Sequence, residues 1–198
     1  MSDMITAKAS DAKYKSHPEG QFVGQCVDTI DLGDSVEQYA DQPAKVVHKC
    51  ALVFRTGERN EETGEYIDIA REFTVSMGEK ANLRKFLEQW RGKPYTAEQA
   101  DAGVPLHKLT GNYGLLSIAH KVSKQSRTYA LLTACVGIPK QMQSATTDYT
   151  DYVRADYWEQ KKKDYAEAVR KHRAEQAPPA EADDFDDSQA LDDDSLPF

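Results

Sequence analysis

Apolar and polar residues alternate in five stretches of the chain, each bounded by turn-forming residues. These stretches are rich in Val, Ile, Phe and Thr, the residues that pack well on a pleated surface. We therefore predict five β-strands, at Gly20–Gly33, Ala44–Thr56, Tyr66–Met77, Asn112–Val122 and Thr128–Ile138. Gly24 lies inside the first of them and predicts a bulge or a sharp bend there.

A helical pattern separates the third strand from the fourth. Its apolar residues recur at i, i+3, i+4 and i+7, which places them on one stripe that ends before Gly92; they are Leu83, Phe86, Leu87 and Trp90. A shorter helix is predicted from Thr96 to Ala102, where Thr96 and Gln99 have capping-box spacing. We expect Trp90, Phe54 and Phe73 to be core residues.

The order strand, strand, strand, helix, strand, strand is that of the OB-fold, a five-stranded Greek-key barrel with a helix between strands 3 and 4. The predicted class is therefore mainly β. Beyond this barrel, a charged stretch from about residue 148 to 175 has apolar residues roughly four apart. It predicts an amphipathic helix that packs either on the barrel or on a partner subunit. After "APPA" the chain has too few apolar residues to fold.

The charges divide the chain in the same way as the pattern. Residues 174–198 hold nine of the 33 acids and no Lys or Arg, which leaves 24 acids against 25 bases in residues 1–173. The net charge of −8 thus divides into about −9 and +1. We predict a flexible N-terminal arm (1–17), an OB-fold domain (18–140), a charged helical extension (141–176) and a disordered acidic tail for protein interaction (177–198).

Several classes of protein are disfavoured by the sequence. A membrane span is not expected, because no run of about 18 apolar residues exists, and the start of the chain lacks a secretory signal, so a cytoplasmic location is expected. Cys26, Cys50 and Cys135 lack metal-ligand spacing and lie in apolar runs, which indicates buried free thiols. The five histidines are scattered and no nucleotide-binding or nucleophile motif is present. We predict no catalytic residue, metal or cofactor.

Basic residues gather where an OB-fold binds nucleic acid. Lys45, Lys49 and Arg55 share one face of the second strand, and the opposite face is mostly apolar. The turn between the last two strands carries Lys121, Lys124 and Arg127, without an acid from Ala119 to Tyr129. In OB-folds these strands and loops contact the nucleic acid, and aromatic rings stack on its bases. The complete set of predicted single-stranded DNA (ssDNA) contacts is Lys45, Lys49, Arg55, Tyr66, Arg71, Tyr113, Lys121, Lys124, Arg127 and Tyr129.

The cations of the second strand and the tyrosines also have a plainer interpretation. Cations on one strand face are often an ordinary solvated surface, and tyrosines in strands are commonly half-buried for packing alone. The absence of an in-phase acid on the second strand favours a surface that binds a polyanion.

The ending "DDDSLPF", with "DDFDD" upstream, resembles the acidic tip of bacterial ssDNA-binding proteins. The stretches "HPEGQFVGQCVDTIDLG" and "EKANLRKFLEQWRGKPYT" resemble phage-encoded ssDNA-binding proteins, which are also expected to be OB-folds. The chain departs from the bacterial housekeeping proteins in having a charged helix and a short proline-containing linker instead of a linker rich in glycine and glutamine. This difference puts their tetramer in doubt and leaves a homo-oligomer open.

The resemblance implies a non-catalytic protein that coats and protects ssDNA during replication and recombination in the host cytoplasm. It also implies that the tip recruits replication, recombination and repair proteins. Phe198 would enter an apolar pocket of the partner with Leu196 and Pro197 beside it, while Asp192, Asp193 and Asp194 face basic residues. Two rivals stay open: a recombination annealing protein, and an adaptor or DNA mimic that acts through its acidic tail. The basic residues of the second strand and of the last turn, with Lys80, Arg84, Lys85, Arg91 and Lys93 of the helix and its exit, argue against the mimic.

Overall fold

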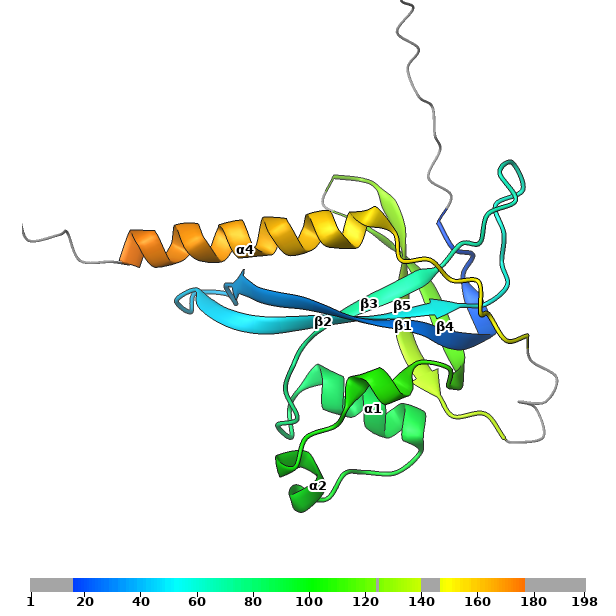
Figure 1. Cartoon of the computed structure of the whole chain (residues 1–198), viewed down its shortest axis with the longest axis horizontal. Helices are drawn as coiled ribbons and strands as arrows, with labels where there is room; N and C mark the ends of the chain where they lie inside the picture. Colours follow the sequence, from blue (N-terminus) through cyan, green and yellow to red (C-terminus); the bar gives the residue numbers. More distant parts are fainter. Residues whose placement is uncertain (1–15, 124, 140–146, 177–198) are drawn as a thin grey trace, which may run out of the picture.

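The computed structural model describes residues 16–123, 125–139 and 147–176, and its centre is a five-stranded antiparallel sheet (Figure 1). The predicted mainly β class and the predicted order of elements are confirmed. In chain order the elements are β1 (Gly20–Glu37), β2 (Lys45–Arg55), β3 (Ile69–Thr74), α1 (Asn82–Arg91), α2 (Ala97–Asp101), the 3-10 helix η1 (Leu106–Leu109), β4 (Tyr113–Val122), β5 (Thr128–Val136) and α4 (Asp156–Gln176).

The strands lie in the order β3-β2-β1-β4-β5, so the long β1 connects the two halves of the sheet. Its first residues pair with β4 and the rest with β2, and Gln25 has a partner in both. The register with β2 shifts between Cys26 and Asp28, so the irregularity lies beyond the predicted Gly24. Gly24 is instead a point of close approach, because a Cβ there would lie 2.7 Å from Leu116 Cδ1.

Helix α1 covers one face of the sheet through the predicted apolar stripe. All four residues of the stripe are buried and belong to a core cluster with Phe54 and Phe73: Leu83, Phe86, Leu87 and Trp90. Trp90 Nε1 also donates a hydrogen bond of 2.9 Å to the carbonyl of Tyr113. The helix ends at Gly92 in the left-handed region, at φ 76°, as the sequence predicted. The capping box of Thr96 and Gln99 at the start of α2 is also confirmed.

The long helix α4 lies on the opposite side of the sheet from α1, along the β1–β2 hairpin (Figure 1). It begins at Asp156, about eight residues later than predicted, and it packs on its own chain. Trp158 is buried there in a second cluster with Ala51 and Val53 of β2 and with Val27, Ile30 and Leu32 of β1. We call this face of β1, β2 and β3 the covered face. The prediction that this side of β2 is open to solvent is wrong from Ala51 onward.

The sheet does not close into a barrel. β3 and β5 are its two edges, and no backbone ladder joins them in the described part of the chain. The guanidinium of Arg71 on β3 spans the gap, since Nη1 donates to the carbonyls of Leu132 and Thr133 on β5 at 3.0 and 2.7 Å. The Arg71 side chain therefore joins β3 to β5 at this seam, whereas backbone hydrogen bonds join the neighbouring strands within the sheet.

The predicted buried thiols are confirmed, because Cys26, Cys50 and Cys135 are all free and buried. Burial raises the pKa of Cys26 to about 12 and that of Cys50 to about 11, so these thiols stay protonated at neutral pH. None of the described helices is long and apolar enough to cross a membrane. The predicted acidic tail and nearly all of the predicted N-terminal arm lie outside the described residues.

Candidate nucleic-acid interface

Arg55 ends β2 on the covered face, where two carboxylates hold its guanidinium. Nε and Nη2 donate to the two carboxylate oxygens of Asp68 at 2.7 and 2.8 Å, and Nη1 donates to Asp151 Oδ1 at 3.2 Å. The hydrogen bonds to Asp68 raise the pKa of Arg55. Only 8% of the side chain is exposed. The sequence predicted an open cation at this position, and the structure places a buried, paired one.

Tyr66 lies next to Arg55 and is flanked by further cationic and aromatic groups. The Arg55 Cζ is 4.2 Å from the centre of the Tyr66 ring, and the Arg59 Cζ is 3.6 Å from the same centre. The ring of Tyr149 meets Tyr66 edge-on at 5.4 Å between centroids. The fold thus brings two predicted contacts, Arg55 and Tyr66, into one group of rings and guanidiniums, the combination that stacks on nucleobases.

Residues 147–155, which we call the strap, cross this group before α4 begins. The side-chain amide of Gln25 on β1 holds the strap through both its nitrogen and its oxygen. Nε2 donates to Asp148 Oδ1 at 2.5 Å, and Oε1 accepts from the Tyr149 N–H at 2.8 Å. Further along, Arg154 donates two hydrogen bonds to Asp28, at 2.7 and 2.9 Å. The strap therefore closes the covered face over Arg55 and Tyr66.

The sequence does not predict the strap as a separate segment, because the spacing of its apolar residues continues that of the helix. Tyr149 and Val153 continue the four-residue spacing of α4 in the sequence, but the helix begins only at Asp156. The dipeptide Asp-Tyr occurs at 148, 151, 156 and 164, and the last two lie in α4. This pair therefore does not distinguish the strap from the helix.

The hairpin between β4 and β5 presents predicted contacts that are open to solvent. Lys121 and Tyr129 are direct cross-strand partners, so their side chains lie on the same face of the hairpin. Tyr129 is 43% exposed, and Lys121 and Arg127 are exposed as well. No carboxylate pairs with these two cations among the described residues. Lys124, the remaining predicted contact of this turn, lies outside the described residues.

The two lysines of β2 face an acid on the neighbouring strand. Lys49 forms an ion pair with Glu37, and Thr74 Oγ1 donates to the same carboxylate at 3.2 Å. The hydrogen bond from Lys49 lowers the pKa of Glu37. Lys45 is the exposed register partner of Glu37. The sequence showed no acid in phase on β2 itself, but cross-strand pairing supplies one from β1.

Arg71 and Tyr113 occupy structural positions. Arg71 is half-buried at the seam between β3 and β5, and desolvation lowers its pKa. Tyr113 is half-buried and donates from its hydroxyl to the carbonyl of Thr147 at 3.1 Å. It lines a pocket of about 410 Å³ with Trp90 and Arg91 of α1. Tyr113 thus contacts the first residue of the strap, and Arg71 contacts the backbone of β5.

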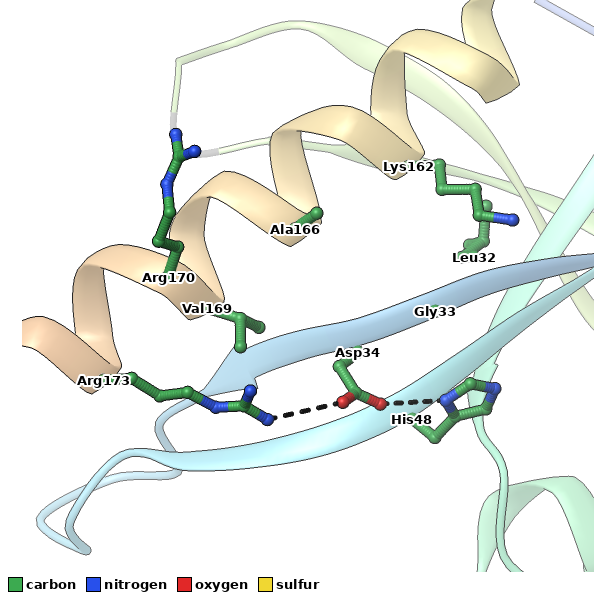
Figure 2. A pocket seen from close by; sticks show the side chains of 9 residues that line it. All are labelled: Leu32, Gly33, Asp34, His48, Lys162, Ala166, Val169, Arg170 and Arg173. Atoms are coloured by element: carbon green, nitrogen blue, oxygen red, sulfur yellow. Dashed lines mark hydrogen bonds and ion pairs between the residues drawn. The ribbon is translucent and has the colours of Figure 1, made fainter.

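A groove of about 560 Å³ separates the second half of α4 from β1 and β2 (Figure 2). Arg173 of α4 and His48 of β2 meet there at Asp34 of β1, with distances of 3.7 and 2.9 Å. Arg170 of α4 points away from Asp34 in Figure 2. The Asp34 carboxylate at the centre of the groove thus compensates Arg173 and His48, two of the basic residues that line it.

The fold and the candidate interface define a mainly β protein with an antiparallel sheet, a covered Arg–Tyr group and an open basic hairpin. A comparison of the chain with protein-family models, curated proteins and solved structures found no match. The predicted tail contacts, Asp192, Asp193, Asp194, Leu196, Pro197 and Phe198, lie outside the described residues.

Proposed function

We propose that this chain is a non-catalytic ssDNA-binding protein whose sheet is an OB-fold with an open seam. Three features support the fold. β1 pairs with both β2 and β4, the helices between β3 and β4 cover one face, and the edges of β3 and β5 meet through Arg71. In a closed OB-fold barrel these edges would pair directly.

The observation that carries the proposed function is the cross-strand pair of Lys121 and Tyr129 on the β4–β5 hairpin. A ring beside an unpaired cation offers a base a stacking surface and a phosphate a countercharge at the same place. The loop between β4 and β5 is one of the nucleic-acid elements of OB-folds. Arg127, two residues before Tyr129 in the chain, extends the positive charge toward the turn.

In this function the protein coats and protects single strands during phage DNA replication, recombination and repair in the host cytoplasm. Binding depends on backbone charge and stacking, and therefore has little sequence preference. The tip "DDDSLPF" recruits partner proteins, with Phe198 as the aromatic anchor and the aspartates as the charge that speeds encounter.

Replacing the hairpin ring tests the proposal. Y129A is expected to weaken binding to a labelled oligothymidylate by roughly 5- to 100-fold, because one stacked base contributes about 1–3 kcal/mol. Fluorescence anisotropy titrations measure the affinity. Y39A is the matched control, since Tyr39 is 79% exposed at the far end of the β1–β2 hairpin. Equal affinities for Y129A and Y39A would remove Tyr129 from the interface.

Replacing the hairpin cations tests the charge contribution. K121A/R127A is expected to make the slope of log affinity against log salt shallower by about 1–1.5, since each phosphate contact of a single strand contributes about 0.7. K80A/K108A removes two exposed cations near α1 and serves as the control. Wild-type protein that binds double-stranded and single-stranded oligonucleotides equally well would contradict the proposed function itself.

A further inference from the structure

The strap bears two carboxylates that accept hydrogen bonds from side chains of the sheet. Asp151 accepts from Arg55 Nη1, and Asp148 accepts from Gln25 Nε2. The remaining Arg55 donors, Nε and Nη2, are satisfied by Asp68 within the body of the protein. The strap therefore supplies the third anionic contact of a guanidinium that is otherwise fixed.

Of the two carboxylates that contact Arg55, Asp151 is the one that a phosphate can replace. It is a single hydrogen bond of 3.2 Å from a side chain that is 66% exposed, whereas Asp68 makes two bonds of 2.7 and 2.8 Å and is 24% exposed. Water and salt compete with Arg55 for the exposed Asp151 carboxylate, which weakens this contact relative to the two hydrogen bonds to Asp68. A phosphate oxygen can take the place of Asp151 without disturbing the pair between Arg55 and Asp68.

The strap is held by side chains and has little apolar burial. Among the described residues, its hydrogen bonds to the sheet all involve a side chain, from Gln25, Asp28, Arg55 or Tyr113. Most of its residues are exposed, Val153 to 82%, and its two tyrosines are half-buried. Tyr149 and Tyr152 pack against the cluster that contains Trp158. Opening of the strap therefore removes the packing of these two rings together with its side-chain hydrogen bonds.

Helix α4 has its own anchors and does not depend on the strap. Trp158 and Val169 are buried against the sheet, and Glu72 of β3 receives an ion pair from Lys161 and a 2.7 Å hydrogen bond from the Tyr165 hydroxyl. Opening of the strap therefore leaves the core cluster beneath α4 in place. The group exposed by opening is Arg55 with the ring of Tyr66, whose edge contact with Tyr149 of the strap is lost.

We propose that the strap is a displaceable cover, and that single-stranded DNA competes with it for the covered face. A phosphate replaces the Asp151 carboxylate at Arg55 Nη1, and a base stacks on Tyr66 in place of the edge of Tyr149. This inference rests on the proposed function and adds a second surface to the open hairpin. The strand binds first at Lys121 and Tyr129, and longer strands then reach the covered face when the strap opens.

The first test weakens the carboxylate contacts of the strap. D148N/D151N is expected to bind a long oligothymidylate about tenfold or more tighter than wild type, because a closed cover lowers apparent affinity by the fraction of open molecules. E167Q/E175Q makes the same change in net charge at exposed positions of α4 and controls for general electrostatics. Anisotropy titrations compare the affinities of the three proteins.

A second variant separates displacement from charge. R154Q cuts the two hydrogen bonds to Asp28 and removes a cation, so simple electrostatics predicts weaker DNA binding, whereas release of the strap predicts tighter binding. K163Q removes an exposed cation of α4 and is the matched control. Thermal melts establish that each variant is folded before the titrations.

Hydrogen exchange of the wild-type protein gives a readout that needs no variant. Saturating oligothymidylate is expected to speed amide exchange in residues 147–155, including the Tyr149 N–H, while it slows exchange in the β4–β5 hairpin. If wild type binds DNA but strap exchange stays unchanged or slows, and both strap variants match their controls, the displaceable cover is refuted and the proposed function stands. If no variant and no wild-type protein binds DNA, both proposals fall.

Discussion

Gly114 is the residue that allows α1 to lie close against β4. A Cβ at this position would lie inside contact distance of Cys135 Sγ and 2.9 Å from Trp90 Nε1. The same close approach lets the Trp90 N–H reach the carbonyl of Tyr113. Both neighbours are buried, so neither can move aside without leaving the packed core.

We therefore expect G114A to lower the free energy of unfolding by about 2 kcal/mol, the usual cost of overpacking a core. Urea denaturation with an unchanged m-value measures this loss. G78A is the matched control, because a Cβ at Gly78 meets only Ser76 Oγ, at 3.5 Å. Equal stability of the two variants would show that the contact between α1 and β4 adapts to an added methyl group.

At the scale of elements, His48 connects β2 to β1, and Asp34 of β1 connects this pair to α4. Its Nδ1 lies 2.9 Å from Asp34 and its Nε2 lies 2.9 Å from Asp31, and Asp34 also meets Arg173 of α4 (Figure 2). The hydrogen bond to Asp34 is the main cause that raises the pKa of His48. The protonated imidazolium is therefore favoured in the folded state.

The raised pKa of His48 determines whether its contribution to stability grows or falls with pH. The contribution of His48 to stability is complete below its unfolded pKa of about 6.5 and is lost as pH rises through the higher folded value. The difference in unfolding free energy between wild type and H48Q is thus expected to be larger at pH 5.5 than at pH 8.5. H107Q changes an exposed histidine of η1 and is the matched control. A difference that grows with pH would contradict the ion-pair geometry.

The sequence predicted the elements well because their signals are local. The stripe of α1, the capping box of α2 and the five alternating runs each depend on neighbours a few residues apart. Contacts between distant segments carry no such signal. The pairing of Arg55 with Asp151 joins residues 96 positions apart, and the seam contact of Arg71 joins β3 to a carbonyl 61 positions away.

In the candidate site too, contacts that are local in the sequence were predicted and contacts between distant segments were not. The cation and ring of the β4–β5 hairpin were predicted together because one turn brings them together. The cations of β2 were predicted to be open, because alternation along a strand says nothing of what covers each face. The strap and α4 cover Ala51, Val53 and Arg55, and Glu37 of β1 compensates Lys49.

On the scale of the whole molecule, the basic hairpin and the acidic segment 174–198 have opposite charge. Eight of the nine acids of that segment follow α4 in the sequence, Glu175 lies in its last turn, and residues 1–173 are close to neutral. A free acidic segment and a DNA strand have the same sign of charge, so they compete for the same cations. We propose that residues 174–198 lower the DNA affinity of the full chain at low salt.

Deleting Asp192–Phe198 removes three of these acids and is expected to raise the affinity for oligothymidylate at about 10 mM salt, where the screening length is about 30 Å. The gain is expected to shrink at about 0.15 M salt, where screening falls to about 8 Å. Anisotropy titrations at both salt concentrations measure it. L196A/P197A/F198A keeps the aspartates and is expected to bind DNA as wild type does, which separates the charge from the anchor. Unchanged affinity of the deletion at low salt would show that the acidic segment does not compete with DNA.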